Sequence, residues 1–417
     1  MNPGGSTRLP TSGGPATRRR NRSFRGMALV AAGLWLAVSL GCAYLPFRRT
    51  PRPPGRTTIS SPLVVLPARI IGNFIIVEAK WDRQGPYHFV IDTGSANTLV
   101  TPTLARRYGI GEPRPGAPRV SVASAEGDLL ELPSAVLRRM DFDDARFEDV
   151  PVLIYDCAAL SAHLGIRIDG VLGFPFFRNA RLTLDYPHNR VLLEPPSRTA
   201  LTPGASVRFE DQNKTPIIRV TLGPRSLLVL LDTGSDATFS INATGINPPF
   251  LSGPRRGATV GTIAGDHPQQ IGRLSEDLVI AEHIVHRPIV DLTDELSAVG
   301  GGLLKYFTVT FDATNDRVTF LRDTHEPITI PPRRSAGLSF SKTPAYWRVA
   351  GVIPDSPAAE AGIQFGDLVS RIDGEPVSKW NLSRYEELVG RADQVTFSLI
   401  FGTNEVEKQV KVFDLVP

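Results

Sequence analysis

Cysteine is scarce in this sequence, which has only Cys42 and Cys157 among its 417 residues. Cys42 lies in an apolar run that we expect to sit in a membrane, so it cannot pair with Cys157. For Cys157 we favour a small buried apolar side chain over a nucleophile. We therefore expect no structural disulfide.

Acidic residues are absent before Glu78, whereas residues 1–62 contain ten Arg. Residues 63–417 hold 36 Lys and Arg against 42 Asp and Glu, a net charge of −6. The basic pI of about 9.1 thus comes from a leader, and the folded part is mildly acidic. A nucleic-acid partner is not expected, because binding to phosphates needs a basic surface on the folded part.

Motifs of several enzyme classes are missing, namely HExxH, GxSxG, the P-loop and the dinucleotide fingerprint. His283 and His286 are three residues apart in a segment predicted to be a strand, where this spacing points them to opposite faces. We expect no metal site and no cofactor. The 417 residues are enough for two or three domains. The 37 Gly and 36 Pro favour a turn-rich, mainly β protein.

The longest uncharged apolar run, residues 27–45, follows a basic N-terminal tail, residues 1–26. Its 19 residues can span a bilayer and predict a signal sequence or membrane anchor. Cys42 follows Ser-Leu-Gly, which resembles a bacterial lipobox, so lipidation of Cys42 and a plain transmembrane cysteine both stay open. Either alternative predicts a membrane-anchored protein of the cell envelope, with the folded part facing the periplasm or the exterior.

Beyond a Pro- and Arg-rich spacer at residues 46–62, the sequence contains an internal repeat. Each copy has two apolar, strand-like segments that lead into Asp-Thr-Gly-Ser, first at residues 92–95 and again at 232–235. The segments LTLDYPHNRVLL (182–193) and VTFDATNDRVTF (309–320) match near the end of each copy. Similar motifs at both ends predict two lobes of the same plan.

The paired Asp-Thr-Gly-Ser tetrads, each followed by two apolar residues and Gly (Val-Leu-Gly at 171–173, Ala-Val-Gly at 298–300), resemble retropepsin-like aspartic proteases. The resemblance covers about residues 63–324 and matches the bacterial branch with both lobes on one chain. It implies two pseudo-equivalent acid-protease β lobes, with Asp92 and Asp232 as a shared catalytic dyad. The expected reaction is hydrolysis of peptide bonds in polypeptide substrates.

The chemistry suits this residue pattern. Two adjacent carboxyls share one proton, so one can act as general base on water while the other donates to the scissile carbonyl oxygen. Gly94 and Gly234 allow the tight turns that bring N–H groups to the carboxylates. The resemblance implies that Thr93 and Thr233 interlock the two loops, and we expect the Ser95 and Ser235 hydroxyls to bond the outer carboxylate oxygens.

Such an enzyme also needs a flap that closes over the substrate. Two turns are candidates, residues 124–128 and residues 261–266, and each follows a short strand-like run.

The last part of the chain resembles a bacterial PDZ domain through PDSPAA (354–359), the pairs Gly366-Asp367 and Asp373-Gly374, and GLSF at 337–340. The resemblance covers about residues 335–417 and implies a β-rich α+β fold that binds polypeptide C-termini. The peptide-binding loop is then Gly337, Leu338, Ser339 and Phe340, with Ser where the family usually has Gly.

The expected function is thus a membrane-tethered aspartic endopeptidase whose PDZ domain recruits or senses polypeptide C-termini. The alternative is a catalytically inactive envelope adaptor that binds peptides through its PDZ domain. The predicted organisation is a tail (1–26), an anchor (27–45), a linker (46–62), lobe 1 (63–198), lobe 2 (199–326), a linker (327–334) and a PDZ domain (335–417).

Overall fold

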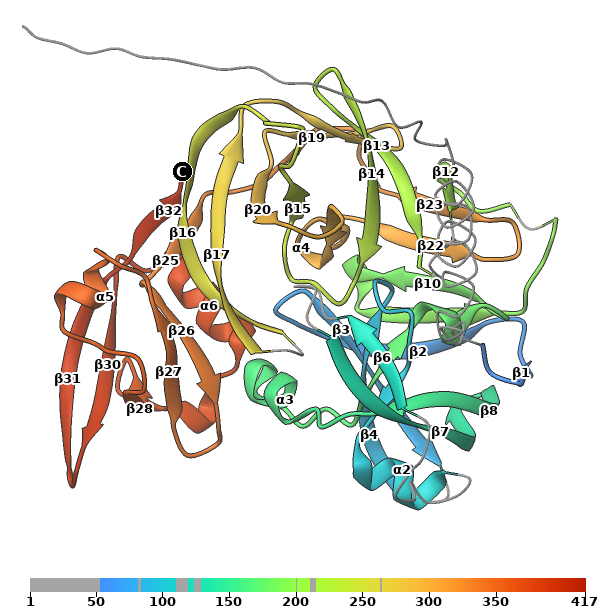
Figure 1. The fold of residues 1–417 in the computed structure, drawn as a ribbon, viewed down its shortest axis with the longest axis horizontal. Coiled ribbons are helices and arrows are strands. Elements are labelled where there is room, and N and C mark those ends of the chain that lie inside the picture. The colour runs from blue at the N-terminus through green and yellow to red at the C-terminus, as the bar shows by residue number, and fades with distance from the viewer. Residues whose placement is uncertain are drawn as a thin grey trace, which may run out of the picture. The chain divides into compact units, whose positions relative to one another are not determined.

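The computed structural model describes residues 53–81, 84–109, 119–123, 129–199, 201–210, 215–262 and 265–417. All of them belong to one compact unit, Thr50–Pro417. The predicted anchor, with Cys42, lies outside the described residues. Within these ranges no helix combines the length and the apolar character required to cross a membrane. The fold is mainly β, as predicted (Figure 1).

The first half of the repeat forms lobe 1. Its strands are β1 (Arg56–Ile59), β2 (Val64–Ile71), β3 (Phe74–Trp81), β4 (Gln84–Asp92), β5 (Leu99–Val100), β6 (Arg119–Ala123), β7 (Leu129–Phe142), β8 (Ala145–Ile154), β9 (Gly170–Gly173), β10 (Arg181–Asp185) and β11 (Arg190–Glu194). Its helices are α2 (Pro102–Tyr108) and α3 (Ala158–Leu164), with short 3-10 turns η2 (Phe174–Phe177) and η3 (Tyr186–His188).

Lobe 2 repeats this plan with fewer helices. Its strands are β12 (Ala205–Glu210), β13 (Ile217–Leu222), β14 (Arg225–Asp232), β15 (Phe239–Asn242), β16 (Phe250–Thr262), β17 (Gly265–Leu274), β18 (Leu278–Ile280), β19 (His283–His286), β20 (Ile289–Thr293), β21 (Ala298–Gly300), β22 (Thr308–Asp312), β23 (Arg317–Leu321) and β24 (Ile328–Thr329). One short helix, α4 (Gly301–Leu304), follows β21.

A six-stranded antiparallel sheet joins the lobes in the order β12–β23–β22–β10–β11–β2. Its two central strands, β10 and β22, are the matched repeat segments, and they pair with Thr183 opposite Thr310. The two hydroxyls are 2.9 Å apart in the buried centre of the sheet. The sequence repeat therefore appears in the structure as a pseudo-two-fold pair of hairpins.

One apolar core runs through both lobes, because alternate residues of their strands point inward. Phe89 and Phe147 of lobe 1 and Phe239 and Phe311 of lobe 2 are among its fully buried aromatic side chains. The lobes are thus packed together as well as hydrogen-bonded.

The C-terminal region has its own sheet, in the order β26–β27–β28–β30–β31 with β29 beside β28. A separate pair joins β25 to β32, and Leu415 and Val416 of β32 are buried in the core of the lobes. The elements are β25 (Arg333–Ser335), β26 (Leu338–Lys342), β27 (Trp347–Val352), α5 (Pro357–Glu360), β28 (Leu368–Ile372), β29 (Glu375–Pro376), η4 (Val377–Lys379), α6 (Leu382–Arg391), β30 (Gln394–Phe401), β31 (Asn404–Lys411) and β32 (Phe413–Val416).

Both predicted linkers differ from the structure. Part of the spacer 46–62 is strand β1, which pairs with β8 and places the half-buried Ile59 against the core. Segment 327–334 contains β24, which pairs with β19, and the start of β25. Ile328 and Ile330 within it are buried in the core of the lobes. Both segments are short and rich in Pro or Arg, so their pairing with distant strands left no sequence signal.

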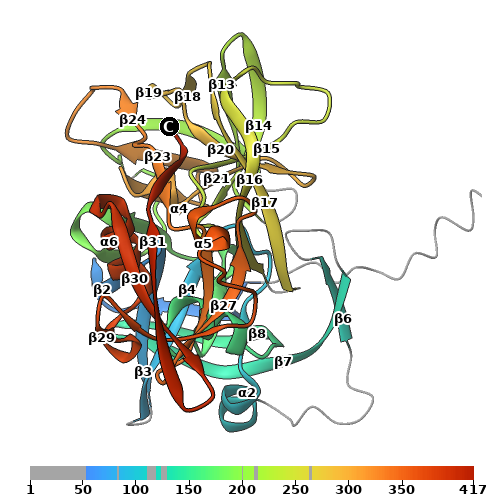
Figure 2. The same cartoon turned by 90° about the vertical axis from the view of Figure 1, so that its left-hand side faces the viewer.

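The candidate flaps are the ends of two hairpins, β6–β7 and β16–β17 (Figure 2). Residues 124–128 lie outside the described residues. The second hairpin is described up to the pair Thr262–Gly265, and residues 263–264 at its end are not. Both therefore stay predictions as flaps.

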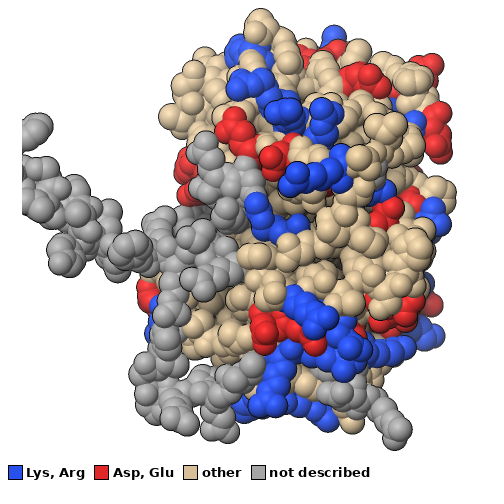
Figure 3. Space-filling model, turned by 90° about the vertical axis from the view of Figure 1, so that its right-hand side faces the viewer, with Lys and Arg blue, Asp and Glu red and all other residues tan. Residues whose placement is uncertain are grey.

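Charge is mixed on the face shown in Figure 3, where Lys and Arg alternate with Asp and Glu. Ion pairs occur in lobe 1, for example between Asp141 and both Arg139 and Arg146. No single sign of charge dominates this face.

Candidate active site

Asp92 and Asp232 each end a buried strand at an equivalent place. Strand β4 runs parallel to β9 and brings Asp92 opposite Gly173, while β14 runs parallel to β21 and brings Asp232 opposite Gly300. A Cβ on either glycine would collide with the loop that follows the aspartate, namely with the carbonyl oxygen of residue 97 or 237. The Gly of each apolar-apolar-Gly motif is therefore needed to let the aspartate loop pass.

The two carboxyl groups face each other across the lobes. The Asp92 and Asp232 side chains are hydrogen-bonded to one another. A Cβ on Gly94 would collide with the carboxyl of Asp232, and one on Gly234 with that of Asp92. Each tetrad glycine thus leaves room for the aspartate of the other lobe, and the structure brings together the two residues that the sequence singled out.

Thr93 and Thr233 lock the two loops together through four hydrogen bonds. The Thr93 hydroxyl donates to the Leu231 carbonyl at 2.6 Å and accepts from the Thr233 N–H at 3.2 Å. The Thr233 hydroxyl donates to the Ile91 carbonyl at 2.7 Å and accepts from the Thr93 N–H at 3.0 Å. Both threonines are fully buried. The two threonines thus join the two loops from both sides, as the family resemblance implies.

The two serines act differently from the expectation. The Ser95 hydroxyl donates to the Asn97 carbonyl at 2.9 Å, and the Ser235 hydroxyl accepts from the Ala237 N–H at 3.3 Å. The predicted bonds from these hydroxyls to the outer carboxylate oxygens are therefore wrong, because each hydroxyl closes its own turn. It is the Ser95 backbone N–H that reaches Asp92 Oδ1, at 2.9 Å.

Burial and mutual repulsion set the protonation of the pair. Burial raises the pKa of Asp92 well above its usual range, and the charge of Asp232 raises it further. Burial also raises the pKa of Asp232, opposed by hydrogen bonds from Asp92 and from the N–H groups of Gly234 and Gly94. Since two adjacent charges cannot both be accommodated, the pair keeps one proton when an isolated aspartate would have lost its own.

The GLSF segment starts the edge strand of the C-terminal sheet. Gly337 has a positive φ of 83° and faces Ser356 so closely that a Cβ would overlap its side chain. Strand β26 then pairs with β27 on one side, with a bulge between Ser339 and Phe340. Among the described residues no strand pairs with its other side, which is the edge where a peptide strand can add.

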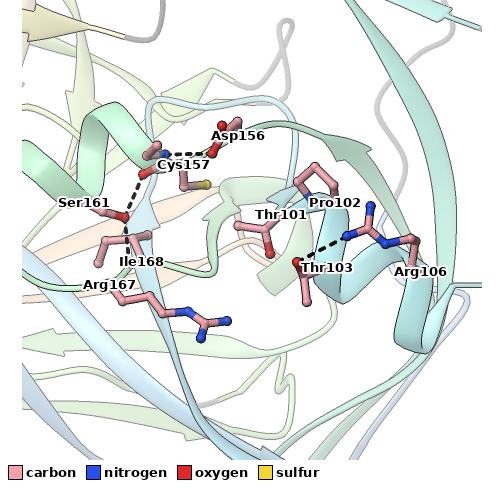
Figure 4. Close-up of a pocket in the computed structure, with 10 residues that line it drawn as sticks. Thr101, Pro102, Thr103, Arg106, Asp156, Cys157, Ser161, Arg167 and Ile168 are labelled. Atoms are coloured by element: carbon pink, nitrogen blue, oxygen red, sulfur yellow. Dashed lines mark hydrogen bonds between the residues drawn. The ribbon is translucent and has the colours of Figure 1, made fainter.

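A cavity of ≈ 520 Å³ lies in lobe 1, away from the two aspartates (Figure 4). None of the tetrad residues lines it. Cys157 on its wall is 1% exposed, and burial raises the pKa of its thiol to about 12, so the thiol is neutral and unreactive. The cavity is lined by Thr101, Pro102, Thr103, Arg106, Asp156, Cys157, Ala158, Ser161, Arg167 and Ile168.

The predicted orientation of the two histidines is confirmed. His283 is buried on β19 and His286 is exposed on its other face. Among the described residues no group of three His, Cys, Asp or Glu side chains is placed to hold a metal ion.

The sequence did not indicate that a residue of lobe 1 contacts the loop after Asp232. Asn73, in the turn between β2 and β3, donates from Nδ2 to the Asp236 carbonyl at 3.0 Å. Gly72-Asn73 between two apolar runs is a turn signal, but its partner lies 163 residues away. Only the assembled fold shows this contact.

Comparison with known proteins agrees with the two motif sets. Residues 77–176 match the family described as aspartyl protease, and residues 348–398 match the PDZ domain. No curated protein matches the chain. One similar solved structure is a PDZ domain protein from Parabacteroides distasonis ATCC 8503, with 19% identity and a TM-score of 0.18. The match covers 20% of this chain and 21% of that one. This chain therefore contains an aspartyl protease segment at residues 77–176 and a PDZ domain at residues 348–398.

Proposed function

We propose that the protein is an aspartic endopeptidase in which Asp92 and Asp232 activate one water molecule between them. The observation that carries the proposal is the facing pair of tetrads, with both carboxyls hydrogen-bonded to each other and both threonines interlocked. A structural turn needs neither the shared proton nor the symmetric lock. Both features serve a pair of carboxyls that must stay at a fixed separation.

The geometry supports acid–base catalysis without a covalent intermediate. The charged carboxylate takes a proton from water, and the water oxygen forms a bond to the carbonyl carbon of the scissile peptide. The protonated carboxyl gives its proton to the carbonyl oxygen, which yields a neutral diol. When the diol collapses, its C–N bond breaks and the leaving nitrogen takes the proton of the protonated carboxyl. The other carboxylate takes the proton of one diol hydroxyl as the new carbonyl forms, so the dyad again holds one proton.

The PDZ domain, in this proposal, binds polypeptide C-termini at Gly337, Leu338, Ser339 and Phe340. Backbone N–H groups of such a loop attract a terminal carboxylate, and the unpaired edge of β26 can accept the peptide as an added strand. Attachment to a membrane through residues 27–45, with or without lipid on Cys42, would place this activity in the cell envelope. That part of the proposal rests on the sequence alone.

Substitution of the dyad tests the activity. With the detergent-solubilised full chain and a peptide library, we expect Asp92→Asn and Asp232→Asn each to lower kcat by at least about 100-fold, because each removes one half of the acid–base pair. Asp323→Asn, an exposed aspartate of lobe 2, is the matched control and should cleave like the wild type.

Two outcomes would contradict the proposal. Near-normal kcat in either dyad variant would exclude a shared dyad. A wild-type chain that cleaves nothing in the library, yet binds peptides with free C-termini and not their amidated forms, would support the inactive adaptor instead.

A further inference from the structure

The PDZ helix α6 contacts the protease lobes at the turn between β2 and β3. The Gly72 N–H donates to Ser383 Oγ at 3.2 Å, near the start of α6. The neighbouring Leu382 is 8% exposed and belongs to an apolar cluster of lobe 1 that includes Ile71 and Phe74. A Cβ on Gly72 would lie 3.3 Å from Leu382 Cγ, so the turn and the helix are in close contact.

From this turn the contact continues to lobe 2 through Asn73. Its backbone is left-handed, with φ 70°. Its side chain donates to the Asp236 carbonyl at 3.0 Å and accepts from Lys305 Nζ at 3.3 Å. On the opposite side Gly301 packs so closely that a Cβ there would lie 3.0 Å from Asn73 Cβ. The turn is therefore wedged between the PDZ helix and lobe 2.

Asp236 directly follows the second tetrad, so this wedge holds the catalytic loop. From the α4 side the Gly301 N–H donates to the Ser235 carbonyl at 2.7 Å and the Gly302 N–H to the Ala237 carbonyl at 3.0 Å. Asn73 binds the carbonyl between these two. The carbonyls of residues 235, 236 and 237 are thus all hydrogen-bonded. The middle one is bound by Asn73, whose neighbour Gly72 is hydrogen-bonded to α6.

Side chains of opposite charge lie near one another across the same contact. Glu386, one turn along α6 from Leu382, interacts with Arg333, Lys342 and Lys305. Burial raises the pKa of Glu386 and lowers the pKa of Lys342 to about 8. Lys342 is 5% exposed, whereas Lys305 and Arg333 are exposed. Lys342 of β26 also donates to the His163 carbonyl of α3 at 2.8 Å. This helix–lobe contact therefore combines a buried lysine with hydrogen bonds and with nearby opposite charges.

We infer that helix α6 of the PDZ domain belongs to the framework of the active site, with Asn73 and Ser383 as positioning residues for the loop of Asp232. The inference rests on the proposed function for its kinetic effect, but the hydrogen-bonded path from Ser383 through Gly72 and Asn73 to Asp236 stands without it. The PDZ domain then supports catalysis directly, in addition to any peptide that it binds.

A pair of Asn→Gly variants tests the Asn73 step. Asn73 and Asn189 both have a positive φ, 70° and 53°, which glycine adopts without strain. Asn73→Gly removes the bond to Asp236, while Asn189→Gly, at an exposed turn, removes no contact with the loop. We expect kcat to fall about 10-fold in Asn73→Gly with KM within about 2-fold, because small misplacements of a catalytic group are costly. Asn189→Gly should match the wild type.

Serine variants test the step in the PDZ domain. Ser383→Ala removes the acceptor for the Gly72 N–H and should lower kcat in the same direction as Asn73→Gly. Ser383→Thr restores the hydroxyl and should recover most of the loss. The control is Ser378→Ala, at an exposed serine of the same domain. All variants should show thermal unfolding midpoints close to the wild type, so that a drop in kcat reports positioning and not unfolding.

Amide hydrogen exchange separates this inference from the proposed activity. In the Asp92→Asn background, where we expect kcat to be strongly lowered, Asn73→Gly should speed exchange at residues 233–237 several-fold, and Asn189→Gly should leave it unchanged. Unchanged exchange and unchanged kcat in Asn73→Gly would overturn the inference. So would a loss of kcat in Ser383→Ala that Ser383→Thr does not recover. If the wild type is inactive, the exchange comparison alone decides.

Discussion

Asp92 and Asp232 face each other in an arrangement that disfavours ionisation of both carboxyls. Their half-buried side chains face each other, and the pKa of Asp92 is raised by desolvation and by the charge of Asp232. In the unfolded chain the same aspartate ionises freely near its usual pKa. The native pair therefore binds more protons than the unfolded chain at moderately acidic pH.

This imbalance predicts the pH dependence of an Asp92→Asn variant. Because folding raises the pKa of Asp92, the contribution of this carboxyl to the free energy of unfolding is largest below its unfolded-state pKa. That contribution is lost as pH rises through the folded-state pKa. The amide carries no charge at any of these pH values. We expect equal unfolding midpoints for wild type and variant near pH 3, and a higher midpoint for the variant at pH 7, by a few degrees.

Thermal unfolding followed by circular dichroism across this pH range provides the measurement. Asp323→Asn, at an exposed carboxylate, should show no such divergence. A wild type that is more stable than Asp92→Asn at pH 7 would show that the carboxyl at residue 92 does not have a raised pKa.

At the scale of elements, the side chains of Thr93 and Thr233 make four hydrogen bonds between the lobes. Thr93→Val keeps the shape of the side chain but leaves the Leu231 carbonyl and the Thr233 N–H without their partner. Each buried group left unpaired costs about 1–3 kcal/mol. We expect a clearly lower free energy of unfolding, by at least about 2 kcal/mol, measured in urea.

The matched control for this prediction is Thr319→Val in the shared sheet. The Thr319 hydroxyl donates only to the exposed Ser206, at 3.2 Å, and water can replace it there. Its cost should stay below about 1 kcal/mol. Equal costs at residues 93 and 319 would mean that the interlock adds nothing beyond an ordinary side-chain hydrogen bond.

Elements with strong periodicity were predictable from the sequence, and those joined only by distant contacts were not. The two tetrads and the hairpins before them follow from apolar runs and turn residues at local spacing. Strand β1 has four residues and a weak pattern, so only its pairing with β8 defines it. The Ser383 contact with Gly72 joins residues 311 apart in sequence, and no local pattern encodes such a partner.

For the whole molecule, the C-terminal region is built into the protease lobes and is not a separate module on a tether. Leu415 and Val416 of β32 are buried in the core of the lobes. Arg273 of β17 is 8% exposed and donates to the carbonyls of Arg287 and Ile330, at 2.9 and 3.1 Å. It also donates to the carbonyl of Pro417. One buried guanidinium thus joins lobe 2, the segment after β24 and the end of β32.

Removing this guanidinium should lower the thermal stability of the chain and weaken the coupling between lobe 2 and the C-terminal region. In Arg273→Ala three carbonyls lose a charged donor, and each such bond contributes about 1.5–3 kcal/mol. We expect calorimetry to show one unfolding transition for the wild type and, for Arg273→Ala, two transitions at lower temperature. Arg255→Ala, at an exposed arginine of β16, should leave one transition near the original temperature. Two transitions already present in the wild type would contradict this view.

The Thr183–Thr310 pair marks an approximate symmetry axis, and the symmetry is broken around it. The span from the tetrad aspartate to the aspartate of the matching hairpin is 93 residues in lobe 1 and 80 in lobe 2, and only the loop of Asp232 is braced by Asn73. Two identical halves would receive an extended chain equally well in either N-to-C direction. Under the proposed function, a reversed substrate would meet different side chains in the two lobes, so we expect the enzyme to favour one N-to-C direction of the substrate.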